Sequence, residues 1–194
     1  MQKVEGKYVF IPVAILSLLT FAFIYKAQVK NFAKGVINYV FTVEQEHYLT
    51  DMHPKYQNIF RRFIAEAEKL GYKVLITSGY RSFQEQVKLH KENAQNAPAG
   101  KSMHNYGVAL DLNLISKKDG SQLKKASTSK AWENTGIVKV AEKLGLKWGG
   151  GKNFGSYHDP VHFEVPLGGD KLYSLAIKQF GNESKVIGNR VSIA

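Results

Sequence analysis

Residues 102–111, SMHNYGVALD, constrain the fold of this chain more than any other segment. They place His104 and Asp111 seven positions apart, and a second histidine, His162, follows 51 residues after the aspartate. Two imidazoles and one carboxylate make a good zinc triad, and they leave the fourth position open, as a hydrolytic site requires. If these residues form a site, the fold has to bring distant segments of the chain to one point.

The composition narrows the kinds of metal site and partner. The chain has 194 residues and no cysteine, so neither a disulfide nor a thiolate zinc site can form. Its 27 basic and 16 acidic residues give a net charge of +11. Such a charge favours a polyanionic binding partner: nucleic acid, anionic lipid or an acidic cell-wall polymer. The alternative is a basic surface that only contacts solvent. No compact arginine-rich run and no nucleic-acid motif is present, so we expect no nucleic-acid partner.

A stretch of 18 residues without charge, YVFIPVAILSLLTFAFIY, occupies residues 8–25. As a helix it would be about 27 Å long, close to the hydrocarbon thickness of a bilayer, with Tyr8 and Tyr25 at the two interfaces. A cleaved signal peptide needs a small-x-small site, which residues 23–27 offer only poorly. We therefore predict an uncleaved transmembrane anchor. Two lysines precede it and three follow, so charge does not set its orientation.

Beyond the anchor, hydrophobic periodicity predicts a mixture of helices and short strands. Helices are predicted from Pro54 to Leu70 and over residues 83–93, 132–144 and 172–180; strands are predicted over 74–77, 108–114 and 162–165; residues 148–151 are predicted to form a flexible turn. Because there is no regular alternation of strand and helix, we expect an α+β fold with a small, mainly antiparallel sheet flanked by helices. The predicted segments are a flank 1–7, the anchor 8–25, a connector 26–48, a globular domain 49–180 and a tail 181–194.

Three motifs in order carry a resemblance to a known family. They are SGYRS at residues 78–82, the segment 102–111, and DPVH at residues 159–162. Together they resemble the zinc peptidases of the D-Ala-D-Ala carboxypeptidase / VanY–VanX group, most closely the L-alanyl-D-glutamate endopeptidase branch of phage endolysins and wall hydrolases. The resemblance runs from about His53 to Val165. It implies a D-Ala-D-Ala peptidase/hedgehog-like fold, Zn²⁺ as cofactor and peptidoglycan stem peptides as substrate.

The resemblance also implies the roles of individual residues. It makes His104, Asp111 and His162 the Zn²⁺ ligands and Asp159 the general base for the attacking water. The alternative for Asp159 is a turn-capping residue before a proline. Glu164 is a rival base, or a carboxylate that orients a histidine ligand.

Five further residues are candidates for substrate contact. Arg81 is expected to stabilise the oxyanion or to clamp a substrate carboxylate, with a surface ion pair as the alternative. Ser102 is expected to hydrogen-bond the substrate or a ligand, unless it is an ordinary loop serine. Tyr106 and Trp148, together with His158, could line the cleft, although aromatic residues beside glycines more often pack in a core.

These observations predict a membrane-anchored zinc metallopeptidase that cuts peptidoglycan stem peptides, at the L-Ala–D-Glu bond. Anionic stem peptides would account for the basic surface. The substrate's location places the domain on the extracytoplasmic (periplasmic) side of the inner membrane, and we expect a monomer. Two alternatives are a D,D-carboxypeptidase that removes terminal D-Ala, and a non-catalytic wall-binding or lysis-regulating module.

Overall fold

The computed structural model describes residues 45–152, 158–182 and 191–193. Residues 45–194 form one compact unit. The predicted anchor at residues 8–25 lies outside the described residues, as do the flank 1–7 and most of the connector. Within the described part of the chain, no helix combines the length and the apolar character needed to cross a membrane.

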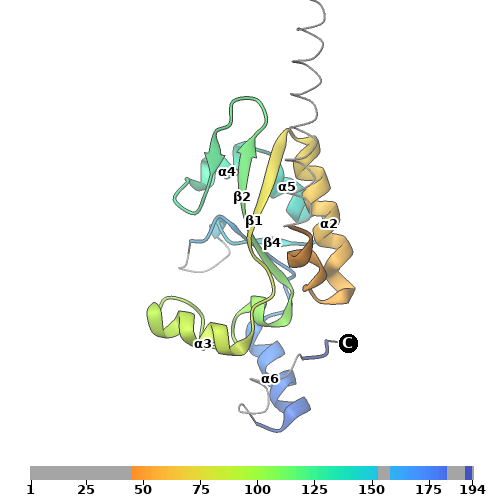
Figure 1. Cartoon of the computed structure of the whole chain (residues 1–194), viewed down its shortest axis with the longest axis vertical. Coiled ribbons are helices and arrows are strands. Elements are labelled where there is room, and N and C mark those ends of the chain that lie inside the picture. Colours follow the sequence, from red (N-terminus) through yellow and green to blue (C-terminus); the bar gives the residue numbers. More distant parts are fainter. Residues whose placement is uncertain (1–44, 153–157, 183–190, 194) are drawn as a thin grey trace, which may run out of the picture. The chain divides into compact units, whose positions relative to one another are not determined.

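The centre of the unit is an antiparallel five-stranded sheet, as the sequence predicts (Figure 1). The strands are β1 (Tyr72–Ser78), β2 (Ala109–Ser116), β3 (Gln122–Leu123), β4 (Lys147–Trp148) and β5 (His162–Glu164). Their order is β1-β2-β5-β4, and β3 pairs with β2 beside this path. In β2 the three leucines Leu110, Leu112 and Leu114 are fully buried, whereas Asp111 and Asn113 on the other face are partly accessible. This alternation gives the strand one core face and one polar face.

Helices lie alongside the sheet and at one of its ends (Figure 1). They are α2 (Pro54–Lys69), α3 (Phe83–Glu92), α4 (Ser129–Asn134), α5 (Ile137–Lys143), α6 (Gly169–Phe180) and the 3-10 helix η1 (Met103–Tyr106). Proline at the first position of α2 and the His53 side chain, which accepts from the Lys55 amide at 3.3 Å, fix where this helix begins. Its Phe60, Phe63 and Ala67 are completely buried. The predicted α+β architecture is therefore confirmed.

Some local features differ from the prediction. The helix expected over residues 132–144 is two helices, because Gly136 has a φ of +80° and the Thr135 hydroxyl accepts from the Ile137 amide. Residues 149–150 form a turn as predicted, but Trp148 belongs to strand β4, which pairs with β5. Strand β3 was not predicted, because two residues are too few to show a period.

Both ends of the described chain pack on the core. Residues 45–50 are helical, and Leu49 and Met52 are buried. Val191 and Ile193, in the predicted tail, are buried as well. The predicted segment boundaries stay predictions.

Candidate metal centre

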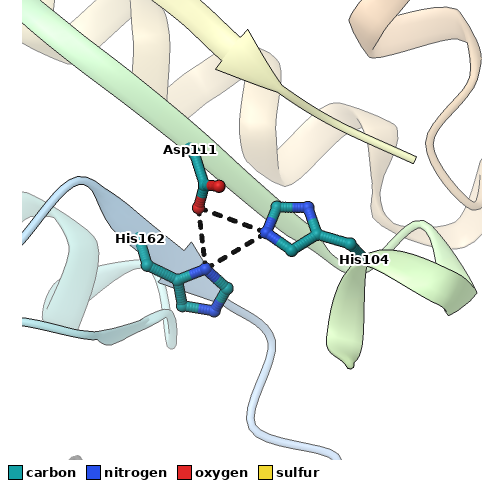
Figure 2. A group of neighbouring side chains, drawn as sticks. All are labelled: His104, Asp111 and His162. Carbon is teal, nitrogen blue, oxygen red and sulfur yellow. Dashed lines mark hydrogen bonds and ion pairs between the residues drawn. The ribbon is translucent and has the colours of Figure 1, made fainter. Parts of the chain in front are cut away.

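His104, Asp111 and His162 point their polar atoms at one another (Figure 2). The His104 Nε2 atom lies 3.2 Å from both Asp111 Oδ1 and His162 Nδ1. His162 Nδ1 lies 2.8 Å from the same Asp111 oxygen. The structure thus brings together the three residues that the sequence suggested as ligands.

Sheet register and one tight turn create this convergence. Asp111 on β2 and His162 on β5 are direct cross-strand partners, so their side chains leave the same face of the sheet. His104 comes from η1, which ends at Gly107 with a φ of +65°. A Cβ on Gly107 would lie 2.6 Å from the His53 amide nitrogen, so only glycine lets the turn pack here.

A second partner for each histidine fixes which ring nitrogen faces the centre. His104 donates from Nδ1 to the carbonyl oxygen of Gly79 at 2.7 Å, which leaves Nε2 toward the centre. His162 donates from Nε2 to Glu164 Oε2 at 3.1 Å, which leaves Nδ1 toward the centre. Outer hydrogen bonds of this kind orient imidazole ligands and raise their basicity.

Three acceptor atoms so close together require a cation or a proton among them. Burial alone would lower the pKa of His162, but its hydrogen bonds to Asp111 and Glu164 raise it from 6.5 to about 9. Burial opposes ionisation of Asp111, yet the His104 and His162 imidazoles hold the pKa of that carboxyl well below its ordinary value. Two imidazole nitrogens and one carboxylate oxygen in this arrangement fit a divalent metal such as zinc.

The triad opens into a cavity of about 430 Å³. The cavity is lined by Arg81, Gln86, Leu89, Gln95, Asn96, Ala97, Lys101, Ser102, Met103, His104, Asp111, Lys125, Asp159, His162 and Glu164. The amide and carbonyl groups of Asp159 are tied to Gly149 and His162, and its side chain is only 13% exposed. Asp159 Oδ2 accepts from Lys125 Nζ at 3.2 Å, whereas the buried Oδ1 has no hydrogen-bond partner in the protein. Buried polar atoms without a partner are rare and are typical of functional sites. Asp159 is therefore a candidate catalytic residue of this cavity.

Arg81 and Ser102 also line this cavity. Arg81 donates to Ser78 Oγ and to Gln86 Oε1, each at 2.8 Å, and its Nη2 lies 3.9 Å from Asp111 Oδ2. The guanidinium is thereby fixed next to the triad. Ser102 is buried at the start of η1.

The structure places Tyr106 and Trp148 in the core, and neither lines the cavity. Tyr106 donates its hydroxyl to the Gly100 carbonyl at 2.7 Å, and burial raises the pKa of the phenol. Trp148 donates its indole N–H to the Pro160 carbonyl at 2.8 Å. Their expected contact with substrate is corrected to packing, because both polar groups are already used inside the protein. His158 is exposed and does not line the cavity either.

Sequence reasoning missed Lys125 and Gln86. Lys125 reaches Asp159 from 34 positions away, and Gln86 is a fully buried amide that holds Arg81. Gln86 lies in α3, but Arg81 precedes the N-cap residue Ser82 and is five positions away, so no helical spacing pointed to this contact. No spacing rule points to Lys125, because a turn between two separate elements presents it.

Known proteins resemble this chain in sequence. Residues 95–165 match the family described as D-alanyl-D-alanine carboxypeptidase, of the M15 peptidases. A relative from Bacillus subtilis (strain 168), the peptidoglycan L-alanyl-D-glutamate endopeptidase CwlK, is 35% identical over 129 residues, which are 60% of this chain and 74% of the relative.

Solved structures resemble it more distantly. The L-Ala D-Glu endopeptidase ChiX of Serratia marcescens has a TM-score of 0.48 and 20% identity, with 66% of this chain and 90% of ChiX covered. VanYB in complex with D-alanine-D-alanine has a TM-score of 0.46 and 16% identity, with 63% and 77% covered. The sequence match to CwlK covers 74% of that relative, and the range matched by the family, residues 95–165, includes His104, Asp111 and His162. The chain therefore belongs to the M15 family of peptidases.

Proposed function

We propose that this chain is a zinc metallopeptidase that hydrolyses the L-Ala–D-Glu bond of peptidoglycan stem peptides. The observation that carries the proposal is the buried Asp159 Oδ1: it has no hydrogen-bond partner in the protein, and its residue lines the same cavity as the three convergent ligand residues. A carboxylate held in this way beside a metal centre is what the activation of water for hydrolysis requires. The relative CwlK, an L-alanyl-D-glutamate endopeptidase by name, supports the choice of bond.

Zinc would be held by His104 Nε2, Asp111 Oδ1 and His162 Nδ1, with the tautomers fixed by Gly79 and Glu164. When bound, zinc supplies a Lewis acid that polarises the scissile carbonyl and lowers the pKa of water.

The protein's own groups move the proton and bind the developing charge. Asp159 accepts a proton from the water whose oxygen bonds to the L-Ala carbonyl carbon. It returns that proton to the D-Glu nitrogen as the C–N bond breaks. Arg81, fixed by Ser78 and Gln86, donates to the oxygen that becomes negative in the transition state.

The peptide substrate also bears on where the enzyme works. Stem peptides lie outside the cytoplasmic membrane, so we propose that residues 8–25 anchor the chain in the inner membrane with its catalytic domain on the extracytoplasmic side. The net charge of +11 favours an anionic polymer as the partner. We propose that the enzyme acts as a monomer, because one chain supplies all the groups of the site.

A second candidate is a D,D-carboxypeptidase, and the description of the matching family favours it. Mass spectrometry of muropeptides digested with the zinc-loaded enzyme separates the two candidates. Release of the peptide that begins with D-Glu is the result we expect. Loss of one terminal alanine would identify the carboxypeptidase instead. Asp159→Asn is the matched control for contaminating wall hydrolases, since it keeps the fold and removes the proposed base.

A further inference from the structure

Lys125 is in contact with the proposed general base. Its Nζ lies 3.2 Å from Asp159 Oδ2, and its side chain is 57% exposed and lines the cavity. Asp159 Oδ1 is buried and has no hydrogen-bond partner in the protein. One oxygen of the proposed base therefore contacts a cation while the other has no partner among the protein groups.

The turn that carries Lys125 is fixed from both sides. The Lys124 amide donates to Ser127 Oγ at 3.0 Å, and the Ser127 amide donates to the Lys124 carbonyl at 2.9 Å. The indole N–H of the fully buried Trp132 donates to the same carbonyl at 3.3 Å. The backbone next to Lys125 is thus tied to the core.

The chemistry of the leaving group determines which substrate group lies near the Lys125 ammonium. In the proposed reaction Asp159 protonates the nitrogen of D-Glu, so this nitrogen has to approach the Asp159 carboxylate. Stem peptides continue from D-Glu through its γ-carboxyl group, which leaves a free α-carboxylate one carbon away from that nitrogen. A cation bound to Asp159 is therefore next to the α-carboxylate.

We propose that Lys125 is a specificity residue that binds the α-carboxylate on the leaving side of the scissile bond. The inference rests on the proposed function. A lysine ammonium has three donors, so Lys125 can keep Asp159 while it donates to substrate. A charge-assisted hydrogen bond at this place favours D-Glu over D-isoglutamine, whose α-carboxylate is replaced by a neutral amide.

The other cations that line the cavity are held elsewhere. Arg81 is bound to Ser78 and Gln86, and Lys101 forms an ion pair with Asp170 of α6. Among the described lining residues, Lys125 is the cation in contact with the base. We therefore assign the contact with the α-carboxylate of the leaving D-Glu to Lys125 rather than to Arg81 or Lys101.

The test uses the full-length, zinc-loaded protein and two synthetic peptides, L-Ala-γ-D-Glu-L-Lys-D-Ala and the same peptide with D-isoglutamine. The readout is the ratio of their kcat/KM values for release of L-Ala. We expect the wild type to prefer the D-Glu peptide by about tenfold, the size of one hydrogen bond to a charged group. Lys125→Met abolishes the preference, Lys125→Arg keeps it, and Lys124→Met, the exposed neighbour, leaves the ratio unchanged.

The ratio separates recognition from a role in positioning Asp159. If Lys125 only holds the base, Lys125→Met slows both peptides equally and the wild-type preference persists, which overturns the inference. Equal cutting of both peptides by the wild type overturns it without any variant. Failure of the wild type to release L-Ala from either peptide overturns the proposed function itself, together with the inference that rests on it.

Discussion

His162 donates from Nε2 to Glu164 Oε2 at 3.1 Å, across two positions of strand β5. Alternate residues of a strand share a face, so the carboxylate stands beside the ring and fixes its tautomer. This geometry favours the orienting role for Glu164, which the sequence left open beside the role of a rival base. Glu164→Gln should weaken zinc binding by about 10- to 100-fold, the usual cost of losing such a partner.

Competition against a chromophoric chelator measures that affinity. Glu142→Gln, on the exposed surface of α5, is the control and should bind zinc as the wild type does. An unchanged affinity in Glu164→Gln would show that Glu164 does not orient the ligand.

Zinc binding should release a proton at neutral pH. In the metal-free protein the pKa of His162 is raised to about 9, so its ring stays doubly protonated between pH 6.5 and 9. The contribution of this bound proton to the free energy of unfolding is fully present below pH 6.5 and is lost as the pH rises through 9. Because zinc has to displace the proton, zinc affinity should rise about tenfold per pH unit and level off above pH 9. Calorimetry in buffers of different ionisation enthalpy counts the protons, and no release at pH 7 would contradict the assignment.

Tyr106→Phe should destabilise the protein without affecting substrate binding. Its hydroxyl donates to the Gly100 carbonyl inside the core, and losing this bond costs about 1–2 kcal/mol in the free energy of unfolding. Urea denaturation measures the stability loss, and KM for the D-Glu peptide should be unchanged. A raised KM with wild-type stability would instead place Tyr106 in contact with substrate.

Asp159→Asn should remove activity and keep the metal. Loss of a general base lowers kcat by about 10²- to 10⁴-fold, whereas zinc affinity is unchanged because Asp159 is not one of the three converging ligands. Asp119→Asn, in the exposed turn between β2 and β3, is the matched control and keeps full activity. Substantial kcat in Asp159→Asn would move the role of base to another group.

The sequence predicted those features that rest on local patterns. The periodic apolar face of α2 and the alternation of buried and accessible residues in β2 are visible in a short stretch of sequence. The metal-ligating residue types, together with the resemblance to a peptidase family, suggested His104, Asp111 and His162 as ligands. The break at Gly136 was missed because the apolar pattern continues across it. Strands β3 and β4 exist only through their partners, which no window of two residues reveals.

Which residues surround the site depends on packing that a sequence pattern does not show. Tyr106 and Trp148 looked like cleft residues because they stand near a ligand and near glycines in the sequence. Which way an aromatic side chain points depends on the packing around it, and here both point into the core. The contact between Lys125 and Asp159 joins two turns that are separated along the chain, so it needed the fold.

The central claim is that a metal held by His104, Asp111 and His162 drives hydrolysis of the stem peptide. The most direct test removes metal from the full-length protein with a chelator, measures release of L-Ala from the D-Glu peptide, and then adds stoichiometric zinc. We predict that activity disappears in the chelator and returns with zinc, while His162→Ala stays inactive at any zinc concentration. Full activity of the wild type in the chelator, or zinc-dependent activity of His162→Ala at the wild-type level, would contradict the claim.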